Sequence, residues 1–163
     1  MRTLRSVAKG AMLTASLCLS MGGPASAQTA RITKLTDVVF GTLSSTTSDI
    51  SAAQNVCVYV QTLSNKYNIR ATGSGTAGAF TLAGVGAPMP YEVQWAASSN
   101  QSTGTTLTAG TALTGQSTVT IDQTCSVLIT STASLIIMLR ATALGQATAG
   151  AYSGTLTLVV APE

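Results

Sequence analysis

Few residues in this sequence of 163 residues are able to do covalent or metal chemistry. It contains three cysteines and no histidine, although histidine is the commonest general base and the commonest metal ligand. The acidic residues are single and scattered, and GxSxG, Walker-loop and dinucleotide-binding motifs are absent from the sequence. We therefore predict that the protein is not an enzyme and that it uses neither a cofactor nor a metal.

Residues 1–27 have the features of a secretory signal peptide. An apolar stretch at 11–19 is followed by Ala25-Ser26-Ala27, a small-x-small cleavage site, and is preceded by the basic residues Arg2, Arg5 and Lys9. We expect one mature domain over 28–163, without a transmembrane anchor.

Two cysteines, Cys57 and Cys125, remain in that domain, because Cys18 lies within the predicted leader. Lipidation of Cys18 is an alternative, but the residues directly before it, Ser16 and Leu17, do not form the small-residue site of a lipoprotein. An even pair in an exported chain predicts a disulfide, and the missing CxxC spacing disfavours a redox or metal site. The two positions are 68 apart, so the closed loop would contribute about 4 kcal/mol.

The positive charge of the sequence belongs to the predicted leader. The formal net charge is +3, and the leader carries three basic residues and no acidic one. A mature chain with a net charge near zero favours association, and it has no basic patch for nucleic acid.

Short stretches of alternating polarity predict an all-β fold. The expected strands lie at 31–41, 55–60, 67–71, 79–82, 91–95, 105–107, 117–121, 134–140 and 152–160. We expect 55–60 and 67–71 to form a hairpin and 142–150 to be a linker. About seven to nine short strands at this spacing are typical of a β-sandwich.

Two of these stretches are predicted to form the core. Tyr91, Val93 and Trp95 alternate with two polar residues, which favours packing in the core over stacking on a sugar or a base. Residues 134–140 are apolar on both faces, and they are too few for a membrane helix. They are therefore expected in the middle of the sandwich.

The last stretch, 150–163, is expected to be a strand with an apolar face formed by Tyr152, Leu156, Leu158 and Val160. Such a strand needs a neighbour on each side, or its edge is open to another chain. The chain that completes this sheet is therefore the central functional question.

The mature chain resembles the small pilin-type subunits secreted by chaperone–usher systems, and most nearly the spore coat protein U-like and archaic pilins. The resemblance is spread over most of the mature chain. Its most specific element is the final strand, where the family's Gly-x-Tyr-x-Gly/Asp-x-Leu-x-Leu pattern corresponds to 150–158 and Gly154 replaces the frequent Asp. The other elements are Phe40-Gly41, Cys57, Tyr67-Asn68-Ile69 and Tyr91-Glu92-Val93.

This resemblance implies an immunoglobulin-like sandwich that lacks its last strand and is completed by a donor strand. In such proteins a periplasmic chaperone donates the strand first, and a neighbouring pilin subunit donates it in the fibre after passage through an outer-membrane usher. The predicted function is an exported structural subunit of a pilus or fimbria, in the periplasm and then in a surface fibre, with a role in cell adhesion or biofilm formation. The strand-exchange groove would lie beside Tyr152, Leu156, Leu158 and Val160.

Two alternatives remain open at this stage. The segment with Ile32, Leu35, Val38 and Phe40 is either an N-terminal donor strand or the first strand of its own domain. In the second case the subunit accepts a strand without giving one, and it sits at a fibre tip or does not polymerise. The other alternative is a self-contained secreted binding module that recognises a glycan or a surface through loops such as 98–115.

Overall fold

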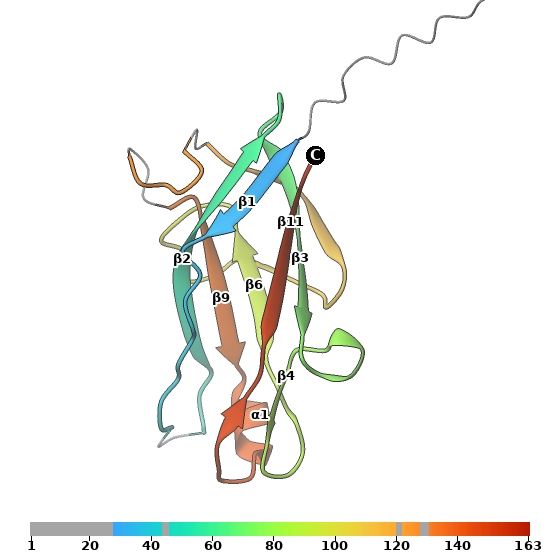
Figure 1. Ribbon diagram of the computed structural model, residues 1–163. Helices are drawn as coiled ribbons and strands as arrows, with labels where there is room; N and C mark the ends of the chain where they lie inside the picture. Colours follow the sequence, from blue (N-terminus) through green and yellow to red (C-terminus); the bar gives the residue numbers. More distant parts are fainter. Residues whose placement is uncertain (1–27, 44–45, 120–121, 128–130) are drawn as a thin grey trace, which may run out of the picture.

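A computed structural model describes residues 28–43, 46–119, 122–127 and 131–163 of the protein. The predicted leader and its Cys18 lie outside the described residues. The described chain forms eleven strands, of which β5, β7 and β10 have two residues each, and one short α-helix (Figure 1). In chain order these elements are β1 (Thr29–Thr33), β2 (Ile50–Gln61), β3 (Lys66–Gly73), the 3-10 turn η1 (Thr76–Gly78), β4 (Thr81–Gly84), β5 (Met89–Pro90), β6 (Glu92–Ala96), β7 (Thr105–Thr106), β8 (Ala112–Ser117), β9 (Ala133–Leu139), α1 (Ala141–Gln146), β10 (Tyr152–Ser153) and β11 (Leu156–Pro162).

The strands form a β-sandwich, as the sequence predicts. One sheet has the order β1-β2-β9-β6-β7, the second has the order β11-β3-β8, and a small third sheet, β10-β4-β5, lies at one end. The strand pairs are antiparallel. Figure 1 shows β11 and β3 in front of β2, β9 and β6, so the two larger sheets form the two layers.

The core lies between these layers and is centred on Trp95. The Trp95 Nε1–H donates a hydrogen bond of 3.1 Å to the hydroxyl of Tyr67, and the two rings meet edge to face with centroids 6.5 Å apart. Burial raises the pKa of Tyr67 to about 12. Tyr91, Val93 and Trp95 are buried, and β9 lies between β2 and β6, so both predictions for the core are confirmed.

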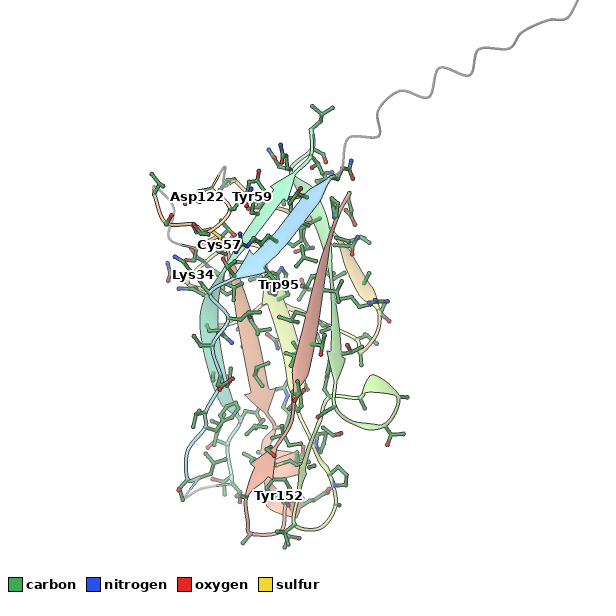
Figure 2. The ribbon with its side chains drawn as sticks, viewed as in Figure 1. Lys34, Cys57, Tyr59, Trp95, Asp122 and Tyr152 are labelled. Carbon is green, nitrogen blue, oxygen red and sulfur yellow. A yellow bond between two sulfur atoms is a disulfide. The ribbon has the colours of Figure 1, made fainter. Side chains whose placement is uncertain are left out.

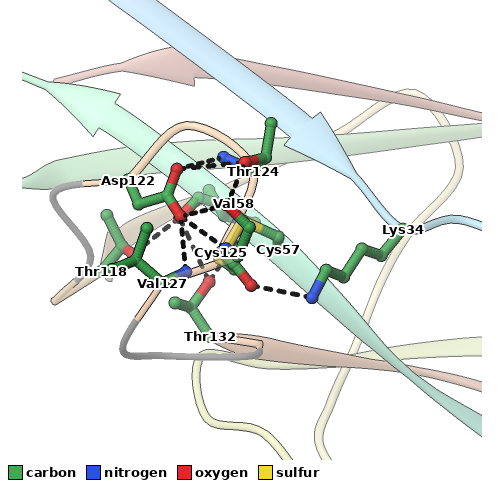
Figure 3. Close-up of a disulfide and its surroundings, with 10 residues drawn as sticks. Lys34, Cys57, Val58, Thr118, Asp122, Thr124, Cys125, Val127 and Thr132 are labelled. Carbon is green, nitrogen blue, oxygen red and sulfur yellow. Dashed lines mark hydrogen bonds between the residues drawn. A yellow bond between two sulfur atoms is a disulfide. The ribbon is translucent and has the colours of Figure 1, made fainter.

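The β1–β2 ladder ends at a covalent cross-link. β2 pairs with β9 through residues 50–56 and with β1 through residues 57–61. At the junction Cys57 forms the predicted disulfide with Cys125, with their Cα atoms 5.8 Å apart (Figure 3). Beside it, the hydroxyls of Thr132 and Thr118 bind the main chain of Val58 in place of a strand neighbour.

The loop that carries Cys125 is held by a single carboxylate. Asp122 accepts hydrogen bonds from the main-chain N–H groups of Thr124, Ser126 and Val127 (Figure 3). The main-chain bond from Thr124, followed by that from Ser126, holds the pKa of Asp122 well below its usual range. On the other side of the disulfide, the Lys34 ammonium donates to the carbonyl oxygen of Cys125 at 2.9 Å.

The first two predicted strand arrangements differ from the structure. The strand expected at 31–41 spans Thr29–Thr33 only, because the chain turns at Lys34, whose φ is 63°. The hairpin expected from 55–60 and 67–71 is wrong, since β2 and β3 belong to different sheets. The turn that ends at Asn65, with φ of 51°, carries the chain from one layer to the other instead.

Two further predictions are corrected. The strand expected at 117–121 is wrong in its described part: β8 ends at Ser117, and Thr118 instead turns its hydroxyl to β2, while 120–121 lie outside the described residues. The linker expected at 142–150 begins with α1. Asp49 accepts the main-chain N–H of Ala141 in the first turn, and Leu144 is buried, so tertiary contacts stabilise this short helix.

The disulfide generates a stability prediction. Replacing Cys57 and Cys125 together with Ala should lower the free energy of unfolding by about 4 kcal/mol, because the 68-residue separation no longer restricts the unfolded chain. Urea unfolding with and without reductant measures this. Reductant should destabilise the wild type and leave the double variant unchanged. If the wild type without reductant were no more stable than the double variant, the prediction would be contradicted.

Candidate functional site

An apolar groove of about 1210 Å³ lies between the segment 35–43 and β10–β11. Its floor is formed by the inner face of β9, where Leu135, Ile137 and Leu139 alternate with residues of the outer face. Tyr91 and Leu144 also line it. Figure 1 shows β9 between the N-terminal segment and β11, so one buried strand serves as the floor for two separate walls.

The first wall is β11. Leu156 and Leu158 point into the groove, whereas Thr157 and the 43% exposed Val159 lie on the outer face. β11 is an edge strand: it pairs with β3 along one side, and in the described part of the chain its other side has no hydrogen-bonded strand. Leu156 and Leu158 therefore face inward as expected, and the main-chain groups on this edge of β11 have no strand neighbour in the described chain. The strand expected at 152–160 is divided, however, because Tyr152 lies in β10, which pairs with β4 rather than with β3.

The second wall is the segment 35–43, which is not a strand. Val38, Phe40 and Leu43 pack against the core, whereas Val39 is 80% exposed. Among the described residues, the main chain of 37–43 has no hydrogen-bonded partner. Both walls of the groove thus present main-chain donors and acceptors without a protein partner.

The two ends of the groove differ. At one end β1 and β11 lie next to each other, beyond the lining residue Leu158. At the other end the ring of Tyr152 lies against Gly84 of β4, where a Cβ atom would be 2.4 Å from the ring (Figure 2). The Tyr152 hydroxyl donates to the carbonyl oxygen of Val85 at 3.0 Å, so glycine at position 84 lets this ring define the end of the groove.

An ion-pair network fixes the end of the floor strand. Arg140, directly after β9, donates to Glu92 at 2.6 Å and to Asp49 at 2.7 Å. The side-chain bond from Arg140 lowers the pKa of Glu92, and the main-chain N–H of Ala141, followed by Arg140, lowers that of Asp49. These charges join the starts of β2, β6 and α1, so their role is to position the floor.

The chemistry of the groove is that of packing and main-chain hydrogen bonding. Of the described residues that line it, only Asp37 is charged. Within the described residues, no cluster of three or more His, Cys, Asp or Glu could hold a metal ion. In the same part of the chain, no helix has both the length and the apolar character that a membrane crossing requires.

The structure brings most of the predicted site residues together. Tyr152, Leu156 and Leu158 line the groove, and Val160 packs against the core. Leu35, Val38 and Phe40 line the opposite wall. Ile32 does not line it: it lies in β1, opposite Val58 of its own chain. The segment predicted as one unit is thus divided between a paired strand and a groove wall.

Sequence reasoning missed the floor and one polar residue of β2 that contacts the second wall. Leu135, Ile137 and Leu139 were predicted only as core, because an apolar strand has the same sequence pattern whether its face is covered by protein or lines a groove. Gln54, which contacts the wall at Thr36, lies just before the strand predicted at 55–60, and no signal in the sequence indicated its role.

Comparisons with known proteins show a similarity of fold. No protein-family model matches the chain, and no curated protein matches it. Four chains of solved structures match. One, from work describing a chaperone–tip adhesin complex as vital for synergistic activation of CFA/I fimbriae biogenesis, has a TM-score of 0.51 and 18% identity. The match covers 83% of this chain, which spans 41% of the length of that one.

The ion-pair network generates a prediction on pH dependence. The pKa values of Glu92 and Asp49 are lower in the folded protein than their ordinary values of 4.5 and 3.8. Their stabilisation is therefore present above about pH 4.5 and is lost as the pH falls through the folded-state values. Arg140→Met should make the thermal midpoint fall less between pH 7 and pH 3 than it falls in the wild type.

Arg70→Met is the control, because Arg70 is exposed on β3 and forms no ion pair among the described residues. Thermal unfolding followed by circular dichroism across the pH series gives the comparison. A pH dependence of Arg140→Met equal to that of the wild type would show that the network contributes nothing to it.

Proposed function

We propose that this protein is a strand-accepting structural subunit of a chaperone–usher surface fibre. The observation that carries the proposal is the apolar groove of about 1210 Å³ between β11 and the segment 35–43, two walls whose main-chain groups have no partners across it. An extended chain is the ligand that satisfies such walls, because it presents donors and acceptors along both of its edges.

The floor supports the same ligand. Side chains of an extended strand alternate between its two faces, so every second residue would point toward Leu135, Ile137 and Leu139. Each buried Val, Leu or Ile side chain contributes about 1.5–3 kcal/mol. A donor with apolar residues at alternate positions is therefore expected.

The resemblance and the similarity of fold support the choice of partners. The solved structure that this chain resembles concerns a chaperone and a tip adhesin in fimbriae biogenesis. For the present chain we propose a periplasmic chaperone, an outer-membrane usher and neighbouring subunits as partners, export to a surface fibre, and a role in cell adhesion or biofilm formation. The proposal concerns the accepting role, since Thr29–Thr33 pairs with β2 of its own chain.

A charge placed in the groove tests the proposal. Leu158→Asp should abolish co-purification with the fimbrial chaperone, because it places a carboxylate on the apolar inner face of β11. Val159→Asp is the matched control: it adds the same charge one residue later, on the outer face, and should leave the complex intact. Equal recovery of the complex from both variants would count against the groove.

Thermal unfolding separates the fibre subunit from the self-contained binding module. A synthetic strand peptide with Val, Leu or Ile at alternate positions should raise the thermal midpoint of the oxidised protein, because ligands that bind only the folded state stabilise it. The same peptide with Asp at two of those positions should have no effect. A sharp, reversible transition of the monomer that neither peptide alters would favour the self-contained module.

A further inference from the structure

We infer that Gln54 is a positioning residue that holds the wall formed by 35–43 at a set distance from β2 and so keeps the groove open for a strand. The inference rests on the proposed function, and it names the contact that determines the shape of the accepting site.

The register of β1 and β2 shows that Gln54 and Thr36 would be opposite each other if the ladder continued. The last pair of the ladder is Thr33 with Cys57, and three residues further along each antiparallel strand are Thr36 and Gln54. In a continued ladder their main chains would exchange hydrogen bonds directly or lie as a close non-bonded pair. The side chain of Gln54 occupies this place instead.

The Gln54 carboxamide binds both sides of the Thr36 main chain. Its Oε1 accepts the Thr36 main-chain N–H at 2.9 Å, and its Nε2–H donates to the Thr36 carbonyl oxygen at 3.1 Å. Oε1 also accepts the Thr36 hydroxyl at 2.9 Å. A side-chain amide thus makes the two bonds that a strand neighbour would make, but it holds the segment one side-chain length away from β2.

The side chain of Gln54 lies on the side of β2 that faces the groove. Gln54 is opposite Leu135 in the β2–β9 register, so its side chain is on the same inner face as the floor, and both residues line the groove. The segment leaves the ladder at Lys34, where the left-handed φ of 63° turns the chain and the ammonium binds the carbonyl oxygen of Cys125. Lys34 turns the segment away from β2, and Gln54 sets the distance between the segment and β2.

The wall depends on this contact because it has few others. After Thr36, the main chain of 37–43 has no hydrogen-bonded partner among the described residues, and Val38, Phe40 and Leu43 supply only packing. Without the Gln54 carboxamide, Thr36 can join the β1–β2 ladder. The wall would then move toward β2 and away from β11, and an incoming strand would have main-chain partners along one edge only.

The test measures the contact and its effect on binding in the same samples of oxidised protein. Gln54→Met keeps the size and removes the three hydrogen bonds, and Gln54→Glu keeps the accepting oxygen but loses the donor to the Thr36 carbonyl. Gln61→Met, at an exposed position of the same strand, is the control. Amide hydrogen exchange by NMR reports on Thr36, and calorimetry with the strand peptide that has Val, Leu or Ile at alternate positions reports on affinity.

In Gln54→Met the Thr36 amide should exchange at least about tenfold faster, and the peptide should bind about tenfold more weakly, as expected when net contributions of about 1 kcal/mol per hydrogen bond are removed. Gln54→Glu should be intermediate in both, and Gln61→Met should match the wild type. If Gln54→Met does not fold, the comparison of Gln54→Glu with Gln61→Met tests the inference by the same two measurements.

The outcomes separate this inference from the proposed function. Unchanged Thr36 exchange in Gln54→Met would overturn the contact itself. Faster exchange with unchanged peptide affinity would overturn its role in positioning the wall and would leave the strand-accepting groove intact. Failure of the wild type to bind the peptide, with Thr36 protected, would overturn the proposed function and with it the role of Gln54 in binding.

Discussion

The β1–β2 ladder ends after five residue pairs, at Thr33 and Cys57, and the shape of the groove depends on this ending. The disulfide to Cys125, the Lys34 contact to the same loop and the threonine hydroxyls on Val58 all lie at this point. Beyond it, the outer edge of 50–56 has no strand neighbour in the described chain. The N-terminal segment is therefore free to become a wall of the groove rather than a longer edge strand.

Main-chain hydrogen bonding is the reason we propose an extended chain, rather than a small molecule, as the ligand of the groove. Edge strands with unpaired donors and acceptors attract other strands, and folded proteins usually cover or disrupt them. Here β11 retains such an edge beside an apolar floor, and the facing segment 37–43 adds a second unpaired main chain. Among the described residues that line the groove, Gln54 has the only amide side chain, and it binds the main chain of Thr36.

Much of the sandwich could be predicted from the pattern of residues, because burial of one face imposes a period of two. Tyr91, Val93 and Trp95 are core, β9 is a central strand, and Leu156 and Leu158 face inward as expected. The pairing of strands was harder to predict from the sequence. Residues 55–60 and 67–71 are both strands, yet they pair with different partners. The turn at Asn65 reverses the chain in either arrangement, so local signals do not distinguish a hairpin from a crossing between layers.

The sequence by itself determined which residues are apolar and alternate, which two cysteines can bond, and that acid–base and metal chemistry lack their usual residues. These are properties of composition and of short-range order. Only the tertiary structure decided that Leu135, Ile137 and Leu139 line a groove, that Ile32 is paired in its own chain while Phe40 forms a wall, and that Gln54 separates that wall from β2. The reason is physical: whether an apolar face is covered, and whether a main-chain group is paired, depends on which distant segments meet, and the period of a single strand carries no information on its neighbours.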